Sequence, residues 1–568
     1  MSDAPDAAGS DTTPATPPEP ETVQSLALQG ADDVSSREAW EQAAAAVLRK
    51  TRALSDDDTD AHVWDRLTRA TLDGIAITPL GTPHDVAELD LEQRPRRVGG
   101  WDVRTQVADN ATALADLDTG ANSLWLKVDG QTDFAALLDG VFLDLAPVTL
   151  EGDVEAARAF LAYAADRELH PATNLGSGVS LAREAQQHAI RSVIVDADTV
   201  HDRGASDVQE LAWALAQGVE ALRIYAGAGF EAAEAARQIE FRLVATDEQF
   251  PTIAKFRAAR RLWARVLELS GAPGVEMAIH AVTSRPMMSA YDPHTNMLRT
   301  TVAAFAAGVG GADAVTVLPF DEPLGAPTDF SRRIARNTSA LLIDESHVAA
   351  VSDPAGGAYA VERLTADLAQ AAWDLFVRLD DEGFSLLDDL IETVATERER
   401  QVALRTRPIT GLSEFPQSAE TRLEREPVDT TPVRRWGAAF EALRDDPRGS
   451  VWLAPLGTIA AHTARATFAG NLFAAGGVAI TNPGPLLDVE ALAAAYDGSP
   501  VVCLVGADAA YAEWGADAIA ALRKSGAKHV ILAGKPGDRT VAADLIDDSC
   551  AMGVDAIAFL TRTREASA

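Results

Sequence analysis

One histidine stands where an α/β domain would present a cofactor ligand. His462 lies in GTIAAHTARATFAG (457–470), directly after the apolar run VWLAPL (451–456). The apolar run predicts a strand, and the alanine-rich stretch predicts a helix. Doubly wound domains bind ligands at the turn between a strand and the helix that follows it. An imidazole ligates a metal well when a carboxylate or carbonyl holds its other ring nitrogen. Residues 456–466 contain no carboxylate. The pattern therefore predicts the remnant of a cofactor site, with His462 as a solvated surface residue.

A second polar group follows another apolar run. In SVIVDADTVHDRGAS (192–206), a predicted strand is followed by Asp198, Thr199 and His201. An imidazole can polarise a carbonyl or transfer a proton at neutral pH, which a threonine hydroxyl cannot do. We expect His201 to lie at a helix start or on the surface.

Composition limits the partners of the chain. Its 568 residues include 49 Lys and Arg against 85 Asp and Glu, a net charge of −36. This excess of negative charge argues against nucleic acid or an anionic membrane as partner, and an anionic substrate would need a local basic patch. No apolar run approaches the ~18 residues of a membrane span. Cys503 and Cys550, in apolar surroundings, are expected to be buried thiols, which favours the cytoplasm.

The elements that must position these groups fall into successive segments. Residues 1–36 predict a disordered acidic tail without signal features, and 37–115 a helical and extended segment with Trp40, Ala44, Val47 and Leu48 on one helix face. Strands and helices alternating over 116–400 predict a (β/α)₈ barrel. Its eight strands are expected at 123–128, 147–151, 171–176, 192–197, 221–226, 275–282, 314–319 and 347–353.

The remainder predicts a linker and a second α/β domain. Residues 401–448 are rich in proline and charge, with one short helix at 434–444. Residues 449–568 predict a flavodoxin-like doubly wound domain. Its five strands are expected at 451–457, 477–481, 501–507, 528–534 and 554–560.

Long motifs in this order resemble a known enzyme family. They are DPHTNMLRTT (292–301), PTDFSRRIARNTSALLIDES (327–346), DPAGGAYAVERLT (353–365) and RPITGLSEFP (407–416). Together with the order of barrel, linker and flavodoxin-like domain, they resemble the B12-dependent acyl-CoA mutases, methylmalonyl-CoA mutase in particular. In this family a catalytic chain holds adenosylcobalamin between its two domains and threads the CoA thioester along the barrel axis. In many bacteria that chain pairs with a smaller, non-catalytic relative.

Set against the family pattern, the cobalamin-binding positions of this chain are degenerate. Catalytic members use D-x-H-x-x-G, and the matching positions here are Ala460, His462 and Arg465. The aspartate that would orient His462 is replaced by alanine, and the glycine beside the cofactor tail by arginine. The resemblance therefore implies that no metal or cofactor is bound by this chain, His462 being the one residue that matches a cobalt ligand.

The barrel positions are degenerate as well. Asp198 and Thr199 occupy the positions of the family's catalytic Tyr-His pair, with His201 two residues later. RPRRVGGWDVRT (94–105) keeps Trp101 but lacks the tyrosine that packs against the corrin. The Arg-rich stretch 332–342 and Asp353 are expected to be structural. We expect side chains to fill the barrel axis.

The resemblance implies the small (beta) subunit of a heterodimeric methylmalonyl-CoA mutase. Such a chain would support a large (alpha) catalytic subunit, which binds adenosylcobalamin and interconverts succinyl-CoA and methylmalonyl-CoA, and residues 37–115 would contact that partner. Two alternatives stay open: an autonomous B12 mutase with an atypical site, and an accessory chain of another acyl-CoA mutase, such as an isobutyryl- or ethylmalonyl-type enzyme.

Overall fold

The computed structural model describes residues 36–91, 97, 99–423, 425–426, 428, 432–537 and 539–567. The tail predicted over 1–36 therefore lies, apart from Ser36, outside the described residues. The chain divides into two units, Met1–Thr68 and Arg69–Ala568. None of the described helices combines the length and the apolarity that crossing a membrane requires.

The described part of the first unit is a small helical assembly. It contains α1 (Arg37–Lys50), the 3₁₀ turn η2 (Asp60–His62) and α2 (Val63–Leu67). The Ser36 side chain caps α1 by accepting a hydrogen bond from the Ala39 amide, as N-cap serines do. Only three apolar side chains are fully buried in its core: Ala45, Leu54 and Val63. The predicted helix face is right in part, since Val47 is 62% exposed.

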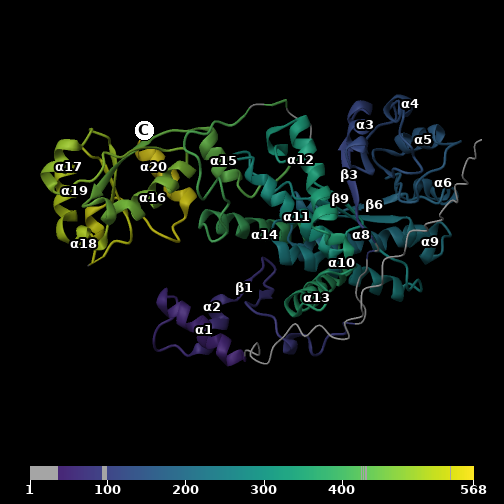
Figure 1. Cartoon of the computed structure of the whole chain (residues 1–568), viewed down its shortest axis with the longest axis horizontal. Helices are drawn as coiled ribbons and strands as arrows, with labels where there is room; N and C mark the ends of the chain where they lie inside the picture. The colour runs from purple at the N-terminus through teal and green to yellow at the C-terminus, as the bar shows by residue number, and fades with distance from the viewer. Residues whose placement is uncertain are drawn as a thin grey trace, which may run out of the picture. The chain divides into compact units, whose positions relative to one another are not determined.

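A parallel seven-stranded sheet dominates the second unit (Figure 1). Its strand order is β5-β4-β3-β9-β8-β7-β6. The strands are β3 (Asp102–Val107), β4 (Ser123–Lys127), β5 (Val148–Glu151), β6 (Val193–Asp196), β7 (Ile239–Ala245), β8 (Ala278–Thr283) and β9 (Ala314–Thr316). Against it pack the long helices α8 (Asp207–Gly227), α10 (Gln249–Leu269), α11 (Thr295–Gly310) and α13 (Tyr359–Glu382). The fold is therefore α/β, with a sheet whose strands are connected through helices.

A single residue connects the two edge strands of this sheet. The predicted strand 171–176 is reduced to one bridge residue, Asn174, which pairs in parallel with Thr149 of β5 and with Arg191, just before β6. The Leu150 amide donates to the Asn174 carbonyl at 2.9 Å, and the Leu175 amide donates to the Arg191 carbonyl at 3.0 Å. The sheet is therefore curled far enough that its two edges meet at Asn174.

Two predicted strands of the barrel are wrong, and two real ones were missed. Residues 221–226 lie inside α8, and 348–350 form a 3₁₀ turn within the predicted strand 347–353. The missed strands are β3 and β7, which carry buried charges, Arg104 on β3 and Glu240 and Arg242 on β7. Charged residues interrupt the apolar run by which a buried parallel strand is recognised. β3 also precedes residue 116, where we expected the barrel to begin.

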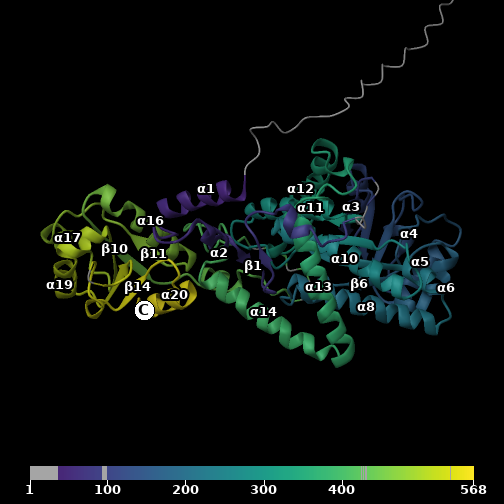
Figure 2. The ribbon, with the colours of Figure 1, turned by 90° about the horizontal axis from the view of Figure 1, so that it is seen from below.

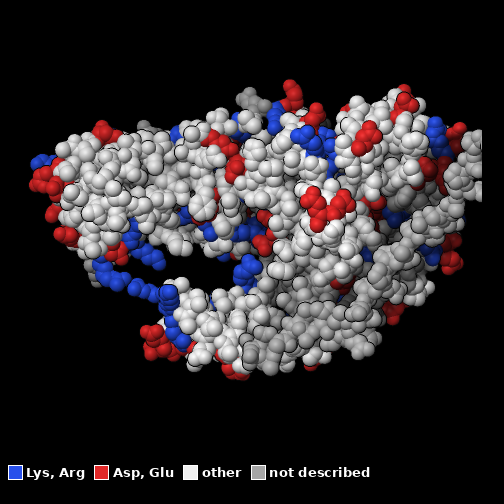
Figure 3. Space-filling model, viewed as in Figure 1, with Lys and Arg blue, Asp and Glu red and all other residues white. Residues whose placement is uncertain are grey.

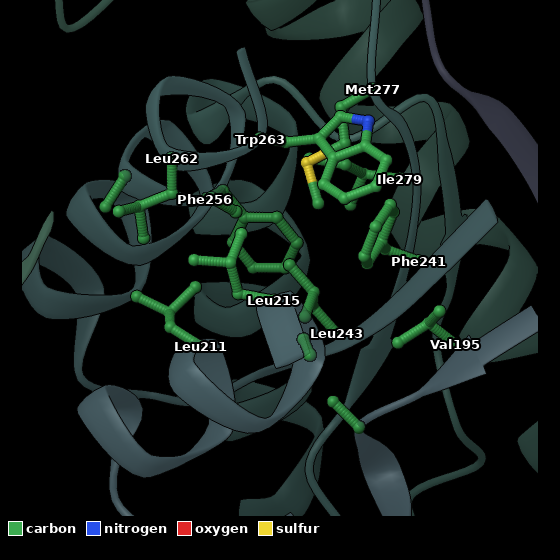
Figure 4. Packing of buried hydrophobic residues seen from close by; sticks show 14 of the residues in the cluster. Val195, Leu211, Leu215, Phe241, Leu243, Phe256, Leu262, Trp263, Met277 and Ile279 are labelled. Atoms are coloured by element: carbon green, nitrogen blue, oxygen red, sulfur yellow. The ribbon is translucent and has the colours of Figure 1, made fainter. Parts of the chain in front are cut away.

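Close packing between helix α8 and strand β7 depends on a glycine. A Cβ atom added to Gly218 would lie 2.8 Å from atoms of the Phe241 and Trp263 rings. Figure 4 shows these two rings side by side among the apolar side chains that fill this core, with ring centroids 4.7 Å apart. The helix can approach the strand this closely only where it carries no side chain.

Gly218→Ala is expected to destabilise the chain by about 1–3 kcal/mol, the usual cost of overpacking a core. Gly227→Ala is the matched control, because Gly227 ends the same helix and its added Cβ would meet nothing within 4 Å. That control is expected to leave stability unchanged or raise it by up to about 1 kcal/mol. Urea unfolding of both variants measures the difference, and equal effects would contradict the packing described.

The second sheet, with its helices, forms the C-terminal, green-to-yellow part of the ribbon (Figures 1 and 2). Its five parallel strands are β10 (Ser450–Leu456), β11 (Ala479–Thr481), β12 (Val501–Gly506), β13 (His529–Ala533) and β14 (Asp548–Cys550), in the order β11-β10-β12-β13-β14. The predicted fifth strand, 554–560, is wrong: it lies almost wholly in α20 (Ala556–Ala566), and the short β14 takes its place. Cys503 and Cys550 are free and buried, as predicted.

The segment between the two sheets is ordered by side-chain contacts where it is described. Helix α14 (Ser385–Ala403) runs past the predicted boundary at 401, and the predicted short helix is α15 (Ala438–Asp445). The Arg434 amide donates to the Asp202 carbonyl at 2.8 Å, and the Trp436 amide to the Pro286 carbonyl at 2.9 Å. These residues of the linker are therefore fixed to the loops that follow β6 and β8.

Candidate functional site

Asp198 and Thr199 lie at the carboxyl end of β6 and face different surroundings. Both belong to the short helix α7 (Asp198–His201) that directly follows the strand. Both carboxylate oxygens of Asp198 accept hydrogen bonds from Arg285 Nη1, at 2.9 and 2.8 Å. Thr199 is exposed, and its hydroxyl donates to the Asp196 carbonyl at 2.8 Å. Asp198 is thus neutralised by an arginine, and Thr199 caps a backbone turn.

His201 is buried, so the expectation of a surface or capping role is wrong. Its Nε2 lies 2.8 Å from Ser284 Oγ, and its Nδ1 lies 3.2 Å from a carboxylate oxygen of Glu210. Glu210 also accepts hydrogen bonds from the buried Lys255 ammonium, at 2.9 Å, and from the Val244 amide, at 2.8 Å. Since Ser284 and Glu210 are fully buried, this cluster ties α7, α8, α10 and the end of β8 together and stays out of reach of a substrate.

Arg285 collects several carboxylates at the mouth of the curled sheet. Besides Asp198, it contacts Asp202 at 3.2 Å and Glu322 at 3.6 Å. Burial and the neighbouring charge of Asp198 raise the pKa of Asp202 to about 8. Burial also raises the pKa of Glu322. One guanidinium cannot fully compensate three buried carboxylates, so the cluster holds a proton at neutral pH. The sequence analysis did not identify Arg285 as a site residue. It closely follows strand β8, and functional side chains commonly gather at the ends of parallel strands.

This cluster predicts a pH dependence of stability. The pKa of Asp202 is higher in the folded chain, about 8, than its ordinary value of 3.8. Between these values the folded state holds a proton that the unfolded state releases, so stability falls as pH rises from about 4 to about 8. One such proton contributes a slope of at most about 1.4 kcal/mol per pH unit. Asp202→Asn is expected to flatten the decline in thermal stability between pH 5 and pH 8. Parallel pH profiles of the variant and the parent chain would contradict this assignment.

Side chains from strands that are not neighbours meet inside the curled sheet. Arg104 of β3 donates to Glu240 of β7 at 2.7 Å, although β9 and β8 stand between these strands in the sheet. The guanidinium of Arg242 lies 4.0 Å from the ring centroid of Trp125 on β4. His280 of β8 lies edge-on to the same indole, with centroids 5.5 Å apart. All five side chains are at most 2% exposed. At this level the interior is filled by side chains, as predicted.

The turn after β10 places its predicted residues on one helix. Ala460, His462 and Arg465 lie in the first turns of α16 (Ile459–Ala475), which begins three residues after the strand. His462 is 5% exposed, so the expectation that it is solvated is wrong. Its Nδ1 is buried without a hydrogen-bond partner among the described residues. An imidazole in this state has no group that fixes its tautomer.

Arg465 crosses the carboxyl ends of the neighbouring strands. It donates to the Gly506 carbonyl at 2.9 Å and forms an ion pair with Asp508. Its guanidinium lies 4.9 Å from the ring centroid of Tyr511 and next to Gly534, where an added Cβ would meet it at 3.2 Å. The Arg465 guanidinium therefore occupies the space at the carboxyl ends of β12 and β13.

Comparisons with known proteins assign this architecture to a family. A family model described as methylmalonyl-CoA mutase matches residues 181–476. The methylmalonyl-CoA mutase small subunit of Streptomyces virginiae is 41% identical, over 96% of this chain and 98% of its own length. The chain belongs to the methylmalonyl-CoA mutase family. The small subunit of Propionibacterium freudenreichii subsp. shermanii is 33% identical, over 95% of this chain and 96% of its length. A probable small subunit of Mycobacterium bovis is 39% identical over 89% of this chain.

Methylmalonyl-CoA mutases are B12-dependent isomerases, so the donor groups of α16 can be compared with what cobalamin requires. A histidine ligand to a metal normally donates its second N–H to a carboxylate or carbonyl. The residues beside His462 supply no carboxylate, and Arg465 is held in place by Asp508. These residues do not fit a cobalt ligand site of the mutase type.

The other family motifs serve structure at the positions described. Asp353 forms an ion pair with the buried Arg257. Arg332 and Arg336 of α12 (Asp329–Ala340) both pair with the buried Asp116. Trp101 packs against Gly308, whose added Cβ would come within 2.4 Å of the indole; Arg94, Pro95, Arg96 and Val98 lie outside the described residues. These motif residues therefore make ion pairs and close packing contacts within the fold.

Proposed function

We propose that this chain is the small subunit of a heterodimeric methylmalonyl-CoA mutase. The observation that carries the proposal is end-to-end similarity to small subunits, covering 96% of this chain and 98% of the Streptomyces virginiae protein. Such a chain supports a large catalytic subunit in the interconversion of succinyl-CoA and methylmalonyl-CoA. Its two free, buried cysteines agree with a reducing compartment, and we place it in the cytoplasm.

The chain itself performs no rearrangement in this proposal. Asp198 and Thr199 stand in place of the catalytic Tyr-His pair, and neither can polarise a thioester carbonyl as an imidazole does. The filled interior formed by Arg104, Trp125 and Glu240 supports the same conclusion, because a pantetheine arm needs a free axis. Adenosylcobalamin is accordingly held by the large subunit, which provides the radical chemistry of the complex.

We further propose that residues 102–400 form a complete eight-stranded barrel. The strand pairs around Asn174 support closure, since they connect β5 to the segment entering β6. The first strand is then β3, ahead of the boundary expected at 116. Residues 404–448 serve as the linker, and 449–568 as a flavodoxin-like domain with a degenerate cobalamin site at Ala460, His462 and Arg465.

The N-terminal segment, 37–115, is proposed to contact the large subunit. The core of the first unit buries only three apolar side chains fully among the residues described. An assembly of this size gains too little from its own core to be stable alone. Docking on a partner would supply the missing burial.

The proposal is tested by assaying each chain and the pair. The full chain and a methylmalonyl-CoA mutase large subunit from the same organism are purified separately, and succinyl-CoA conversion is measured with added adenosylcobalamin. We expect no turnover by this chain alone and turnover by the pair, which should also co-elute on size exclusion. Turnover by the isolated chain, or failure of the two chains to associate, would refute the assignment.

A further inference from the structure

The surface formed by α16, the edge strand β11 and the loop after β11 is almost free of charge. Residues 457–487 contain a single Asp, Glu, Lys or Arg, namely Arg465, whereas 24% of the residues in the whole chain are charged. The chain carries a net charge of −36, and acidic side chains are distributed over the face seen in Figure 3. Thirteen uncharged residues of this stretch are exposed, and we call them the neutral face: Thr458, Ile459, Ala460, Thr463, Ala464, Thr467, Ala479, Ile480, Thr481, Asn482, Pro483, Pro485 and Leu487.

The neutral face is one continuous surface. Its positions on α16 recur every three or four residues, so they line one side of the helix. At the start of the helix, the Gly457 amide donates to the Leu486 carbonyl at 2.7 Å, which brings Leu487 next to this turn. Further along, a Cβ added to Gly470 of α16 would lie 3.3 Å from the δ-methyl group of Ile480 on β11. Figure 2 shows α16 and β11 at the same end of the ribbon. The helix and the strand therefore adjoin along this face.

An open sheet edge lies inside the neutral face. Among the described strands, β11 pairs only with β10, so its outer side presents backbone N–H and C=O groups to a partner. All three of its residues are exposed and uncharged. The opposite edge strand, β14, carries Asp548, which forms an ion pair with Arg562 at 2.9 Å. Charges on an edge strand discourage pairing with another chain, and β11 lacks this protection.

Three large apolar side chains project from the neutral face. Ile459 is 65% exposed, Ile480 is 42% exposed and Leu487 is 66% exposed. A partner can cover such a surface without removing water from a charged group, which is the costly part of burying polar surface. Elsewhere in the same domain, α19 (Ala516–Lys524) exposes three charged residues over nine positions. The neutral face is thus suited to be buried, whereas α19 is suited to face water.

We propose that the neutral face docks on the large subunit, an inference that rests on the proposed function. The centres of permanent interfaces are depleted of charge and rich in apolar side chains. A second copy of this chain is a poorer occupant, because two chains that each carry a net charge of −36 repel one another.

The size and the open edge of the neutral face fit the same partner. Its thirteen exposed residues are about half of the roughly 20–30 residues that a stable interface uses on each side. The neutral face would therefore be one part of a larger contact, to which the N-terminal segment contributes another part. At β11, an extended segment of the large subunit can add to the sheet through main-chain hydrogen bonds.

Surface plasmon resonance of the full chain on an immobilised methylmalonyl-CoA mutase large subunit from the same organism tests the proposal. The variant Ile480→Lys/Leu487→Glu places one charge of each sign on the neutral face and leaves the net charge unchanged. Both side chains are exposed, so the fold should tolerate the change. We expect at least tenfold weaker binding, because the interface would bury charges without partners.

A matched control makes the same two exchanges outside the neutral face. Phe142→Lys/Met552→Glu alters side chains that are 71% and 88% exposed, and it should bind within twofold of the parent chain. Thermal unfolding midpoints of all variants are measured alongside. If the first variant unfolds at a lower temperature, Ala464→Arg decides, since arginine is a good helix former and this helix position is exposed. It should weaken binding at least fivefold.

Two outcomes would overturn the proposal while leaving the proposed function standing. In the first, the parent chain binds the large subunit and the neutral-face variants bind as tightly as the parent. In the second, sedimentation velocity shows that the isolated parent chain is a dimer which Ile480→Lys/Leu487→Glu dissociates, so that a second copy is the occupant. A parent chain that does not bind the large subunit would refute the proposed function itself, and the docking surface with it.

Discussion

Glu240→Ala is expected to lower the free energy of unfolding by about 3–5 kcal/mol, the usual cost of breaking a buried ion pair from one side. Glu240 is 2% exposed and accepts hydrogen bonds from Arg104 at 2.7 Å and Arg191 at 3.1 Å. Burial alone would raise the pKa of Glu240, but these arginines hold it below the usual range. Removing the carboxylate leaves the Arg104 cation in the interior of the sheet without its partner. Urea unfolding followed by tryptophan fluorescence measures the loss.

Two controls separate this cost from a general loss of packing. Arg104→Met/Glu240→Leu removes both charges while keeping apolar volume, and should be far more stable than the single variant. Glu392→Ala breaks an exposed pair with Arg434 and should change stability far less than Glu240→Ala does, because exposed ion pairs are screened by solvent. A single variant as stable as the parent chain, or no better stability in the double variant, would show that this pair does not support the interior.

Deleting residues 1–68 is expected to weaken binding to the large subunit at least a hundredfold while leaving the rest of the chain folded. The deletion falls between the two units of the structure, so it leaves the cores of both parallel sheets complete. The removed unit contains paired indoles, Trp40 and Trp64, with ring centroids 4.8 Å apart. Tryptophan-rich patches carry a large share of binding energy in protein interfaces.

Binding is measured by surface plasmon resonance on immobilised large subunit, and folding by the thermal unfolding midpoint. The point variant Trp64→Ala, in the full chain, is expected to weaken binding in the same direction by a smaller factor. Unchanged affinity of the deleted chain would contradict a role of this segment in assembly. A large fall in its thermal midpoint would instead show that the segment packs on its own chain.

The second α/β domain was largely predictable because its strands are continuous apolar runs. β10, β12 and β13 are fully buried almost along their whole length, as strands covered on both faces should be. The error at 554–560 has the same origin, since an apolar run of that length is compatible with a buried helix as well as a strand. The three-residue β14, with Asp548 and Ser549, gives too short a signal to compete.

The first sheet was harder to predict because its interior is polar. Arg104, Glu240 and Arg242 sit on strands β3 and β7 at positions that pattern analysis assigns to solvent. Arg104 and Glu240 pair with each other across strands that are not neighbours, and Arg242 pairs with Asp196 and Glu151. The sequence does not say which of these residues meet. The same holds for His201, whose partners Glu210 and Ser284 lie 9 and 83 residues away.

The sequence predicted which family site residues are missing from this chain. It did not predict the contacts made by the residues that stand in their place. Absence of a carboxylate near His462 is visible in the sequence, as is the replacement at Arg465. The burial of His462 was not predicted. His462 lies in the first turn of α16, which begins at Ile459, and there its imidazole is buried in the domain and not exposed at the strand ends.

The most direct test is an absorbance titration of the isolated, full-length chain with adenosylcobalamin. We expect the spectrum of the free cofactor to persist and gel filtration to separate the cofactor from the protein. A spectrum showing that the cofactor's own base has been displaced by a protein imidazole, and its loss in His462→Ala, would contradict it.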